Sequence, residues 1–185
     1  MLLNLGCGKK LNENCVNVDI TRYKGVDQVV DLSVFPWPWD SGSIDGIIAS
    51  HIIEHFPDQK KFIDECYRVL EGGGFLKLVV PHASHVSSVG CLGHFRTYSY
   101  DTLRAYLSAP FYMFKKAKFK TVKQELRWWY EEVDAEGNLP KWSLPYIKAV
   151  DTIMNWIIKL SPRVFENVFS GFIQTREVIW VGLKI

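Results

Sequence analysis

Short apolar runs alternate with turn residues through the first half of the chain. Five runs rich in Val, Ile and Leu occur at Leu2–Leu5, Val16–Ile20, Val26–Leu32, Ile44–Ser50 and Phe75–Pro81. Runs of this length without polar alternation are typical of strands that are buried on both faces of a parallel sheet. The pattern therefore predicts five neighbouring strands of one largely parallel sheet.

A helical pattern separates the last two of these runs. Asp58 is placed to cap a helix that reaches Leu70, and the glycines Gly72–Gly74 are expected to end it. Its apolar stripe consists of Phe62, Ile63, Cys66, Tyr67, Val69 and Leu70. Ser99 is expected to cap a second helix, which carries Leu103 and Leu107. Alternation of strands and helices of this kind predicts a doubly wound α/β sheet.

The second half of the chain has longer elements. Lys118–Tyr130 and Glu177–Ile185 are predicted to be strands, and Leu144–Leu160 has the apolar spacing of a helix packed on the domain. A helix on a membrane surface or at a partner interface would share that spacing. We interpret residues 131–172 as a helical insertion between the last two strands, within a single domain that spans residues 1–185.

Composition and charge narrow the class of protein. The 185 residues are 48% hydrophobic with a net charge of +2, which predicts a packed core and gives no strong nucleic-acid signal. The four cysteines form no C-x-x-C pair, which is typical of reduced thiols in a cytosol. The N-terminus lacks a basic region, and no stretch is long and apolar enough for a transmembrane segment. We therefore expect a cytoplasmic protein.

The strongest chemical signal is the stretch L-N-L-G-C-G-K-K, which directly follows the first predicted strand. A tight glycine turn lets backbone N–H groups approach an anionic ligand closely. Asp19 ends the next strand and could accept hydrogen bonds from ribose hydroxyls, while Asp31 and Leu32 follow the third, where an adenine edge would lie. An NAD fingerprint would need a third glycine where Leu11 stands, and a longer connection before Val16.

Histidines raise the question of a metal site. His51-x-x-Glu54-His55 spells the H-x-x-E-H signature of an inverted zinc protease, but a buried strand leads into it and Pro57 follows, so no long helix fits. The spacings His82-x-x-His85 and Cys91-x-x-His94 would also permit zinc. A base or substrate contact at the rim of the ligand crevice outweighs that interpretation, so no metal is predicted.

Four stretches together resemble a known family. They are LNLGCG, VDI, DLSVFPWPWDSGSIDGIIASHIIEHF and LEGGGFLKLVVP, and they cover residues 1 to about 85. They resemble the class I S-adenosylmethionine-dependent methyltransferases, in particular the small type 11 (UbiE-like) domains. Asn4 stands where that family usually has an acidic residue, and Lys10 replaces the last glycine of its first motif.

The resemblance implies a Rossmann-like fold with a seven-stranded, mostly parallel sheet, helices on both faces and one antiparallel strand near its end. It also implies S-adenosylmethionine as cofactor and S-adenosylhomocysteine as product. The residues expected to bind the cofactor are Asn4, Gly6, Cys7, Gly8, Asp19, Ile20, Asp31, Leu32, Ser50 and His51. A general base for an oxygen acceptor would be His82 or His85 first, and His51 or Glu54 second.

The methyl acceptor is left open by the sequence. The resemblance favours a small molecule, a glycan or a lipid intermediate. The insertion could form a lid, or a homodimer surface, through Trp128, Trp129, Trp142, Trp156 and Phe165. Two rival functions remain. One is a non-catalytic methyltransferase-like subunit, because Asn4 and Lys10 depart from the family's first motif. The other is an NAD-dependent oxidoreductase.

Overall fold

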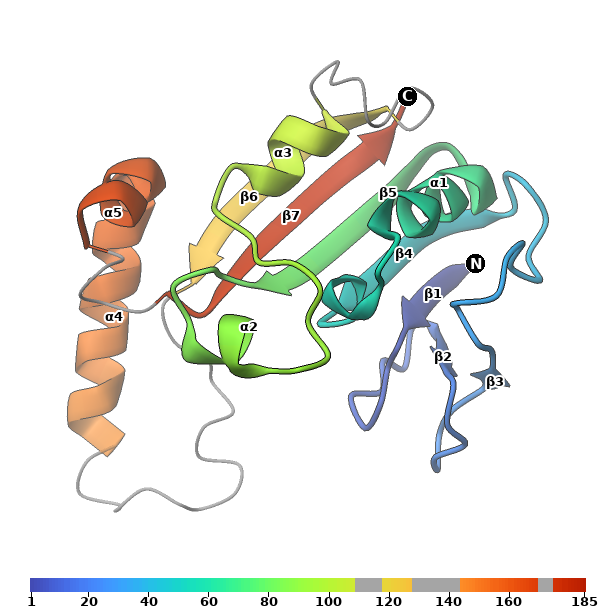
Figure 1. Cartoon of the computed structure of the whole chain (residues 1–185), viewed down its shortest axis with the longest axis horizontal. Coiled ribbons are helices and arrows are strands. Elements are labelled where there is room, and N and C mark those ends of the chain that lie inside the picture. The colour runs from blue at the N-terminus through green and yellow to red at the C-terminus, as the bar shows by residue number, and fades with distance from the viewer. Residues whose placement is uncertain (109–117, 128–143, 170–174) are drawn as a thin grey trace.

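The computed structural model describes residues 1–108, 118–127, 144–169 and 175–185 (Figure 1). Its centre is a seven-stranded sheet with the order β3-β2-β1-β4-β5-β7-β6. The strands are β1 (Leu2–Leu5), β2 (Val16–Asp19), β3 (Gln28–Val29), β4 (Ile44–Ser50), β5 (Leu70–Pro81), β6 (Phe119–Arg127) and β7 (Glu177–Lys184). Strands β1 to β5 pair in parallel, and β7 is antiparallel to both of its neighbours. This is the predicted fold class.

Helices are concentrated after β4. They are the 3-10 turn η1 (Ile53–His55), α1 (Gln59–Val69), α2 (Val86–Gly90), α3 (Thr102–Leu107), α4 (Leu144–Leu160) and α5 (Pro162–Phe169). Figure 1 shows α1 and α3 in front of the sheet, and α4 with α5 on the side of β6. Residues 6–43, all of which the structure describes, contain no helix. The short first connection therefore leaves the glycine loop without a following helix, as its ten residues predict.

One face of the sheet forms the centre of the core. Val18, Leu5, Ala49, Leu78 and Trp180 lie side by side across five strands, and all five are fully buried. The apolar face of α1 packs against this same cluster. Burial of apolar side chains in register across the strands is what fixes the positions of the strand ends.

The opposite face is more polar. The next row across the same strands contains Asn17, Asn4, Ile48, Lys77 and Val181. The two asparagines are buried, whereas the other three residues are half-buried. This face therefore offers polar groups directly below the first loop, where they can shape it.

Three predicted element boundaries differ in the structure. The glycines Gly72–Gly74 do not end α1 but lie inside β5, because the helix already stops at Leu70, which pairs with Ile44. The run Val26–Leu32 supplies only the two-residue β3. The N-cap of α3 is Asp101 rather than Ser99, whose backbone N–H donates instead to Thr102 Oγ1.

Parts of two predicted elements in the second half of the chain lie outside the described residues. Strand β6 ends at Arg127, and residues 128–130 of the predicted strand lie outside the described residues. So do residues 131–143 and 170–172 of the predicted insertion, including Trp142. In the described part of the chain no helix has the length and apolar character needed to span a bilayer.

Candidate functional site

The loop after β1 turns back sharply on itself. Gly6 and Gly8 both have the positive φ angles, 61° and 52°, that favour glycine. A Cβ atom on Gly6 would lie 2.2 Å from Cδ1 of Ile52, so this glycine allows the loop to pack tightly against the segment after β4. The backbone N–H of Cys7 donates to the carbonyl of Val18 at 3.0 Å and anchors the loop on β2.

The other end of this turn is open. A Cβ atom on Gly8 would meet nothing within 4 Å. The Gly8 N–H donates to Oδ2 of Asp19 at 2.8 Å, and the Thr21 N–H donates to Oδ1 at 2.9 Å. The Asp19 carboxylate is thereby fixed beside bare loop backbone, with lone pairs left to accept further hydrogen bonds.

Asn4 explains how this loop is held without the acidic residue usual at its position. Its side-chain Nδ2 donates to the carbonyl of Lys10 and to Oδ1 of Asn17, both at 2.9 Å. Asn17 Oδ1 also accepts from the Asn12 N–H at 2.8 Å. An ionised carboxylate has no N–H to donate, so this network requires the amide. Asn4 therefore supports the loop from beneath.

The end of β3 contributes a second carboxylate. Asp31 is exposed, and its Oδ1 accepts hydrogen bonds from the backbone N–H and the hydroxyl of Ser33. These hydrogen bonds lower the pKa of the Asp31 carboxyl, so it is ionised at neutral pH. The side chain of Leu32 is buried in the core, so its backbone is what remains for a ligand, whereas Ile20 is exposed.

His51 occupies a strained position where β4 ends, after Ser50. Its φ of 52° is unusual for a residue other than glycine, and its N–H donates to the carbonyl of Val79 at 2.9 Å. Its Nε2 lies 3.2 Å from Oε2 of Glu177, and its Nδ1 lies 3.4 Å from Oε1 of Glu54. Although burial favours the neutral ring, these two carboxylates raise the pKa of His51 to about 9. The ring is therefore a cation at neutral pH.

The H-x-x-E-H string does not form the helix of a zinc protease. His51 ends a strand, and only the three-residue η1 carries Glu54 and His55. The long helix that a zinc protease needs through this string is therefore not formed. Sequence reasoning missed Glu177, which pairs with His51 across 126 positions of the chain, because no local pattern points to it.

The two histidines after β5 lie in different surroundings. His82 was expected at the rim of a crevice, but it is only 2% exposed. Its Nδ1 accepts from the Ser84 N–H, and its Nε2 lies 2.8 Å from Oε1 of Glu166. Both ring nitrogens are thus engaged in the interior.

His85, by contrast, is half-buried. Burial, followed by the positive charges of Arg176 and His51, lowers the pKa of its imidazole. The ring is therefore neutral at pH 7 and chemically able to accept a proton.

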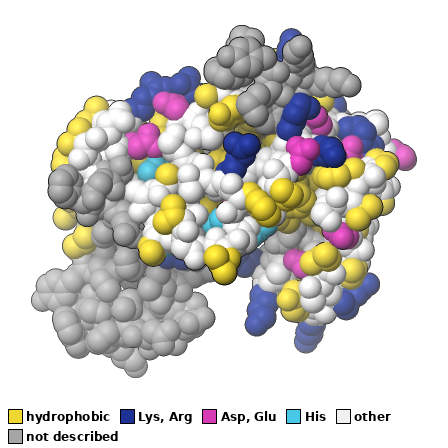
Figure 2. Space-filling model, in the orientation of Figure 1, with side chains coloured by type: hydrophobic (Ala, Val, Ile, Leu, Met, Phe, Trp, Pro, Cys, Tyr) yellow, Lys and Arg dark blue, Asp and Glu magenta, His cyan; other side chains and the backbone are white. Residues whose placement is uncertain are grey.

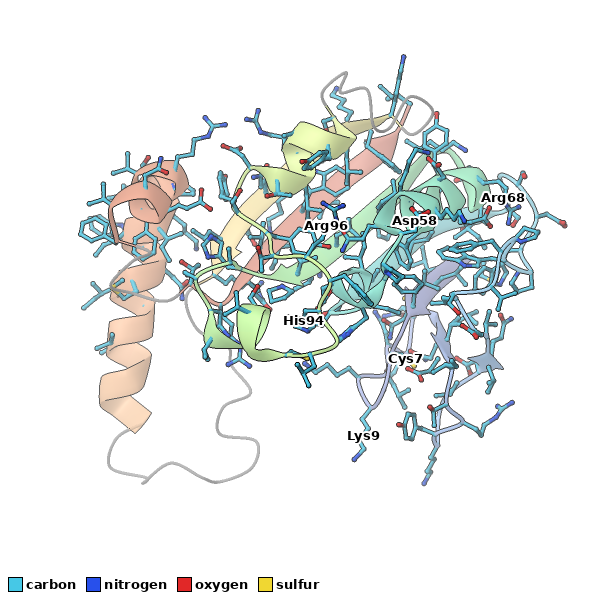
Figure 3. All side chains as sticks on the ribbon, viewed as in Figure 1. Cys7, Lys9, Asp58, Arg68, His94 and Arg96 are labelled. Carbon is cyan, nitrogen blue, oxygen red and sulfur yellow. The ribbon has the colours of Figure 1, made fainter. Side chains whose placement is uncertain are left out.

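A cavity of about 810 Å³ lies between α1, α3 and the loop at residues 94–98. Its lining includes Ile53, His94, Arg96 and Tyr98. Ile53 follows Ile52, the residue that contacts Gly6, so the chain segment after β4 lies between this cavity and the glycine loop. Figure 3 shows His94 and Cys7 near the carboxyl ends of the parallel strands.

Comparisons with known proteins find methyltransferases similar to the first part of the chain. Residues 3–78 match a family described as methyltransferase domain. A probable S-adenosylmethionine-dependent methyltransferase of Mycobacterium tuberculosis (strain H37Rv) is 36% identical over 62 residues, which are 34% of this chain and 22% of that protein. The chain thus spans about a fifth of the length of the curated relatives it matches.

Solved structures extend the likeness to the whole fold. A SAM-dependent methyltransferase from Archaeoglobus fulgidus has a TM-score of 0.59 at 14% identity, covering 99% of this chain and 85% of that one. A phosphoethanolamine N-methyltransferase of Haemonchus contortus, solved with a methylated phosphoethanolamine and S-adenosylhomocysteine, also has a TM-score of 0.59. Its identity is 13%, and the match covers 99% of this chain and 48% of that one.

Proposed function

We propose that this chain is a class I S-adenosylmethionine-dependent methyltransferase, which binds S-adenosylmethionine and transfers its methyl group to a small-molecule acceptor. The observation that carries the proposal is the contact between the glycine loop and the acidic residue of β2. The Gly8 N–H donates a hydrogen bond of 2.8 Å to the Asp19 carboxylate, at the carboxyl ends of neighbouring parallel strands. Ligands of open α/β sheets bind at this edge.

The described residues suit the cofactor in shape and in charge. The open space beside Gly8 leaves room for a ligand against bare backbone. Asp19 would accept hydrogen bonds from the ribose hydroxyls, and the ionised Asp31 would accept from the adenine side. The remaining predicted contacts belong to the ends of the first four strands: Asn4, Gly6 and Cys7 in or after β1, Ile20 after β2, Leu32 after β3, and Ser50 and His51 at the end of β4.

When bound, the cofactor supplies a methyl group on a positively charged sulfur, which a nucleophile displaces in line. The task of this chain is to align the nucleophile and to exclude water, which can lower a barrier by about 7–11 kcal/mol. Two parts of the chain are suited to this alignment: the segment at His51, which follows β4, and the half-buried His85, which follows β5. His85 is the residue that we propose as the general base for an oxygen acceptor.

Support for a small-molecule acceptor comes from the Haemonchus contortus enzyme, which was solved in complex with phosphomonomethylethanolamine. A glycan or lipid acceptor would fit the same chemistry. The rival binding subunit would bind the cofactor without turnover on any acceptor. The absence of a third glycine at Leu11 disfavours the NAD-dependent rival.

Calorimetric titration with S-adenosylmethionine and S-adenosylhomocysteine tests the proposal. Hydrogen bonds from the two ribose hydroxyls to the charged Asp19 carboxylate are worth about 1.5–3 kcal/mol each. Asp19→Ala should therefore weaken binding at least about 100-fold. Asp40→Ala, which removes an exposed carboxylate from the turn before β4, should leave binding unchanged. A wild-type chain that binds neither compound, or that binds NADH more tightly, would overturn the proposal.

A further inference from the structure

Glu54, His55 and His94 each present a ligand atom within 4.8 Å of the other two. We infer that these three residues bind a divalent transition-metal ion of the kind that accepts imidazole and carboxylate, with Zn²⁺ as its representative. The cluster unites η1 with a loop almost forty residues later. It therefore goes beyond the proposed methyl transfer and does not depend on it.

Glu54 gives the first argument. Its side chain is 0% exposed, and among the described residues neither of its carboxylate oxygens accepts a hydrogen bond. Nδ1 of His51 lies 3.4 Å from Oε1 as an ion pair, whereas no described group is paired with Oε2. Buried carboxylates in proteins are normally paired with hydrogen-bond donors or coordinate metals. A metal ion would give Oε2 a partner and would add a second positive charge beside this buried carboxylate.

The two histidines are oriented as metal ligands usually are. His55 Nδ1 lies 3.0 Å from the carbonyl of Gly93, so it donates its proton there and leaves Nε2 as the ligand atom. A hydrogen bond from the second ring nitrogen to a backbone carbonyl is the usual support of a metal-bound imidazole. His94 Nδ1 is buried and, in the described part of the chain, has no hydrogen-bond partner. The two rings meet edge to face, with centroids 4.8 Å apart.

The backbone holds the two segments together. The Phe95 N–H donates to the carbonyl of Glu54 at 2.8 Å, next to the proposed ligand His94. A Cβ atom on Gly93 would lie only 3.2 Å from Nδ1 of His55, so the loop approaches η1 as closely as a glycine permits. The arrangement is therefore built by main-chain contacts rather than by chance proximity of long side chains.

The donor set selects the class of ion. Two imidazoles and one carboxylate suit Zn²⁺ and similar ions, with metal–ligand distances of about 2.0–2.2 Å. Ligand atoms in a tetrahedral site are about 3.3 Å apart, so the exposed His55 has to turn inward slightly. Three protein ligands leave one position open, and His94 also lines the cavity of about 810 Å³. Some histidine atoms are visible on the molecular surface in Figure 2, which has the orientation of Figure 1.

The proposed ligands differ from the set His82, His85, Cys91 and His94, whose spacing in the sequence would permit zinc. Cys91-x-x-His94 and His82-x-x-His85 are not brought together, because His82 is engaged with Glu166 in the interior. The sequence-based prediction of no metal weighed that spacing against a base or substrate contact, and weighed the H-x-x-E-H string by itself, without His94 beside it. The residues that do meet come from the H-x-x-E-H string and from the later His94.

Titration of the purified full chain with ZnCl₂, followed by calorimetry and by metal analysis after dialysis, tests the site. The wild type should retain one Zn²⁺ per chain. His94→Ala and Glu54→Gln should each weaken binding by about 100-fold or more. The wild type loaded with Co²⁺ should show the intense visible absorption of a four- or five-coordinate ion, and both variants should lose it. Circular dichroism would establish that the variants remain folded.

Two further variants make the test specific. His85→Ala removes a histidine outside the cluster and should leave Zn²⁺ binding unchanged. Cys91→Ser removes the exposed thiol nearest to Gly93 and should also leave it unchanged. No retained Zn²⁺ in the wild type, equal binding by the folded His94→Ala variant, or loss of binding in Cys91→Ser would each overturn the inference.

Discussion

His51, His82 and His85 all follow the ends of β4 and β5, yet their surroundings give them different chemistry. His82 is enclosed between Ser84 and Glu166, so its proton-accepting nitrogen is already used. His51 lies between two carboxylates that hold it protonated. Only His85 combines partial exposure with a lowered pKa. At the scale of single residues, His85 is thus the group best suited to remove a proton from an acceptor.

His85→Ala should therefore affect turnover in a way that depends on the acceptor. For a hydroxyl acceptor, loss of a general base is expected to lower kcat by about 10²–10⁴-fold, with the affinity for S-adenosylmethionine unchanged. For an amine acceptor that arrives unprotonated, the change should be small. Steady-state kinetics with hydroxyl and amine compounds found in an acceptor screen would measure both effects.

The pH dependence of the same reaction provides a control. Because burial and, to a lesser extent, the positive charges of Arg176 and His51 disfavour the charged ring, the pKa of His85 lies below the ordinary 6.5. The base is then unprotonated above that pKa, and kcat should fall only as the pH drops through it. His85→Ala should lack this acidic limb. With a hydroxyl acceptor, an unchanged kcat or an unchanged pH profile would mean that His85 is not the base.

Helix α1 shows how one element supports the site from a distance. Asp58 caps it by accepting from the Lys61 N–H, and Arg68 in its last turn reaches the preceding loop (Figure 3). The Arg68 guanidinium donates to the carbonyls of Trp37 and Trp39, while Glu65 accepts from the Trp37 N–H. Glu65 and Arg68 together thus anchor the helix-free segment at Trp37 and Trp39 to α1.

Glu65→Gln should weaken this tie and change its acid sensitivity. Burial opposes ionisation of Glu65, but the hydrogen bonds from Arg68 and the Trp37 N–H outweigh it and lower the pKa of this carboxyl. Its stabilising contribution is therefore complete above the unfolded pKa of about 4.3 and is lost as the pH falls through the folded value. At pH 7 the variant should lose about 1–3 kcal/mol of unfolding free energy.

Urea unfolding between pH 7 and pH 3 would measure this effect. The wild type should lose more stability than Glu65→Gln over the acidic part of that range, so the two curves should converge. Glu71→Gln, which changes an exposed carboxylate in β5, should follow the wild type. Parallel curves for the wild type and Glu65→Gln would contradict the proposed role of the pair.

Elements were predictable from sequence where the pattern and the packing agree. The strands Leu2–Leu5 and Ile44–Ser50 were predicted with the observed bounds because turn residues flank their apolar runs. The helix Leu144–Leu160 was predicted with the observed bounds because its apolar residues have helical spacing. The glycines at 72–74 were misread as a stop because β5 is defined by the residues on either side of them, Leu70 and Phe75, which pair with β4. That pairing is a long-range contact, which a local pattern does not contain.

The same distinction applies to the site. The glycine loop and Asp19 were predictable because both directly follow predicted strands, whose parallel pairing brings their ends together. Glu166 and Glu177 were not, because they contact His82 and His51 across 84 and 126 positions of the chain. The cluster of Glu54, His55 and His94 likewise became visible only once the loop was placed against η1.

The molecule as a whole is a sheet with helices α4 and α5 attached on the side of β6, away from the glycine loop (Figure 1). Polar contacts of α5 contribute to this attachment. Glu166 of α5 lies 2.8 Å from His82 and also accepts from the Tyr100 N–H, and Arg163 pairs with Asp101. Because His82 and Glu166 are both shielded from solvent, their hydrogen bond should contribute more than an exposed pair.

His82→Ala should therefore loosen α5 while leaving the far strands intact. Loss of a hydrogen bond to a charged partner costs about 1.5–3 kcal/mol. Amide exchange in Pro162–Phe169 should accordingly become about 10–100-fold faster, while exchange in β1 and β4 stays unchanged. Hydrogen exchange followed by mass spectrometry resolves these segments, and His85→Ala serves as the matched control. Equal acceleration in β1 and β4 would mean that His82 stabilises the whole fold, and no acceleration in α5 would mean that other contacts hold the helix.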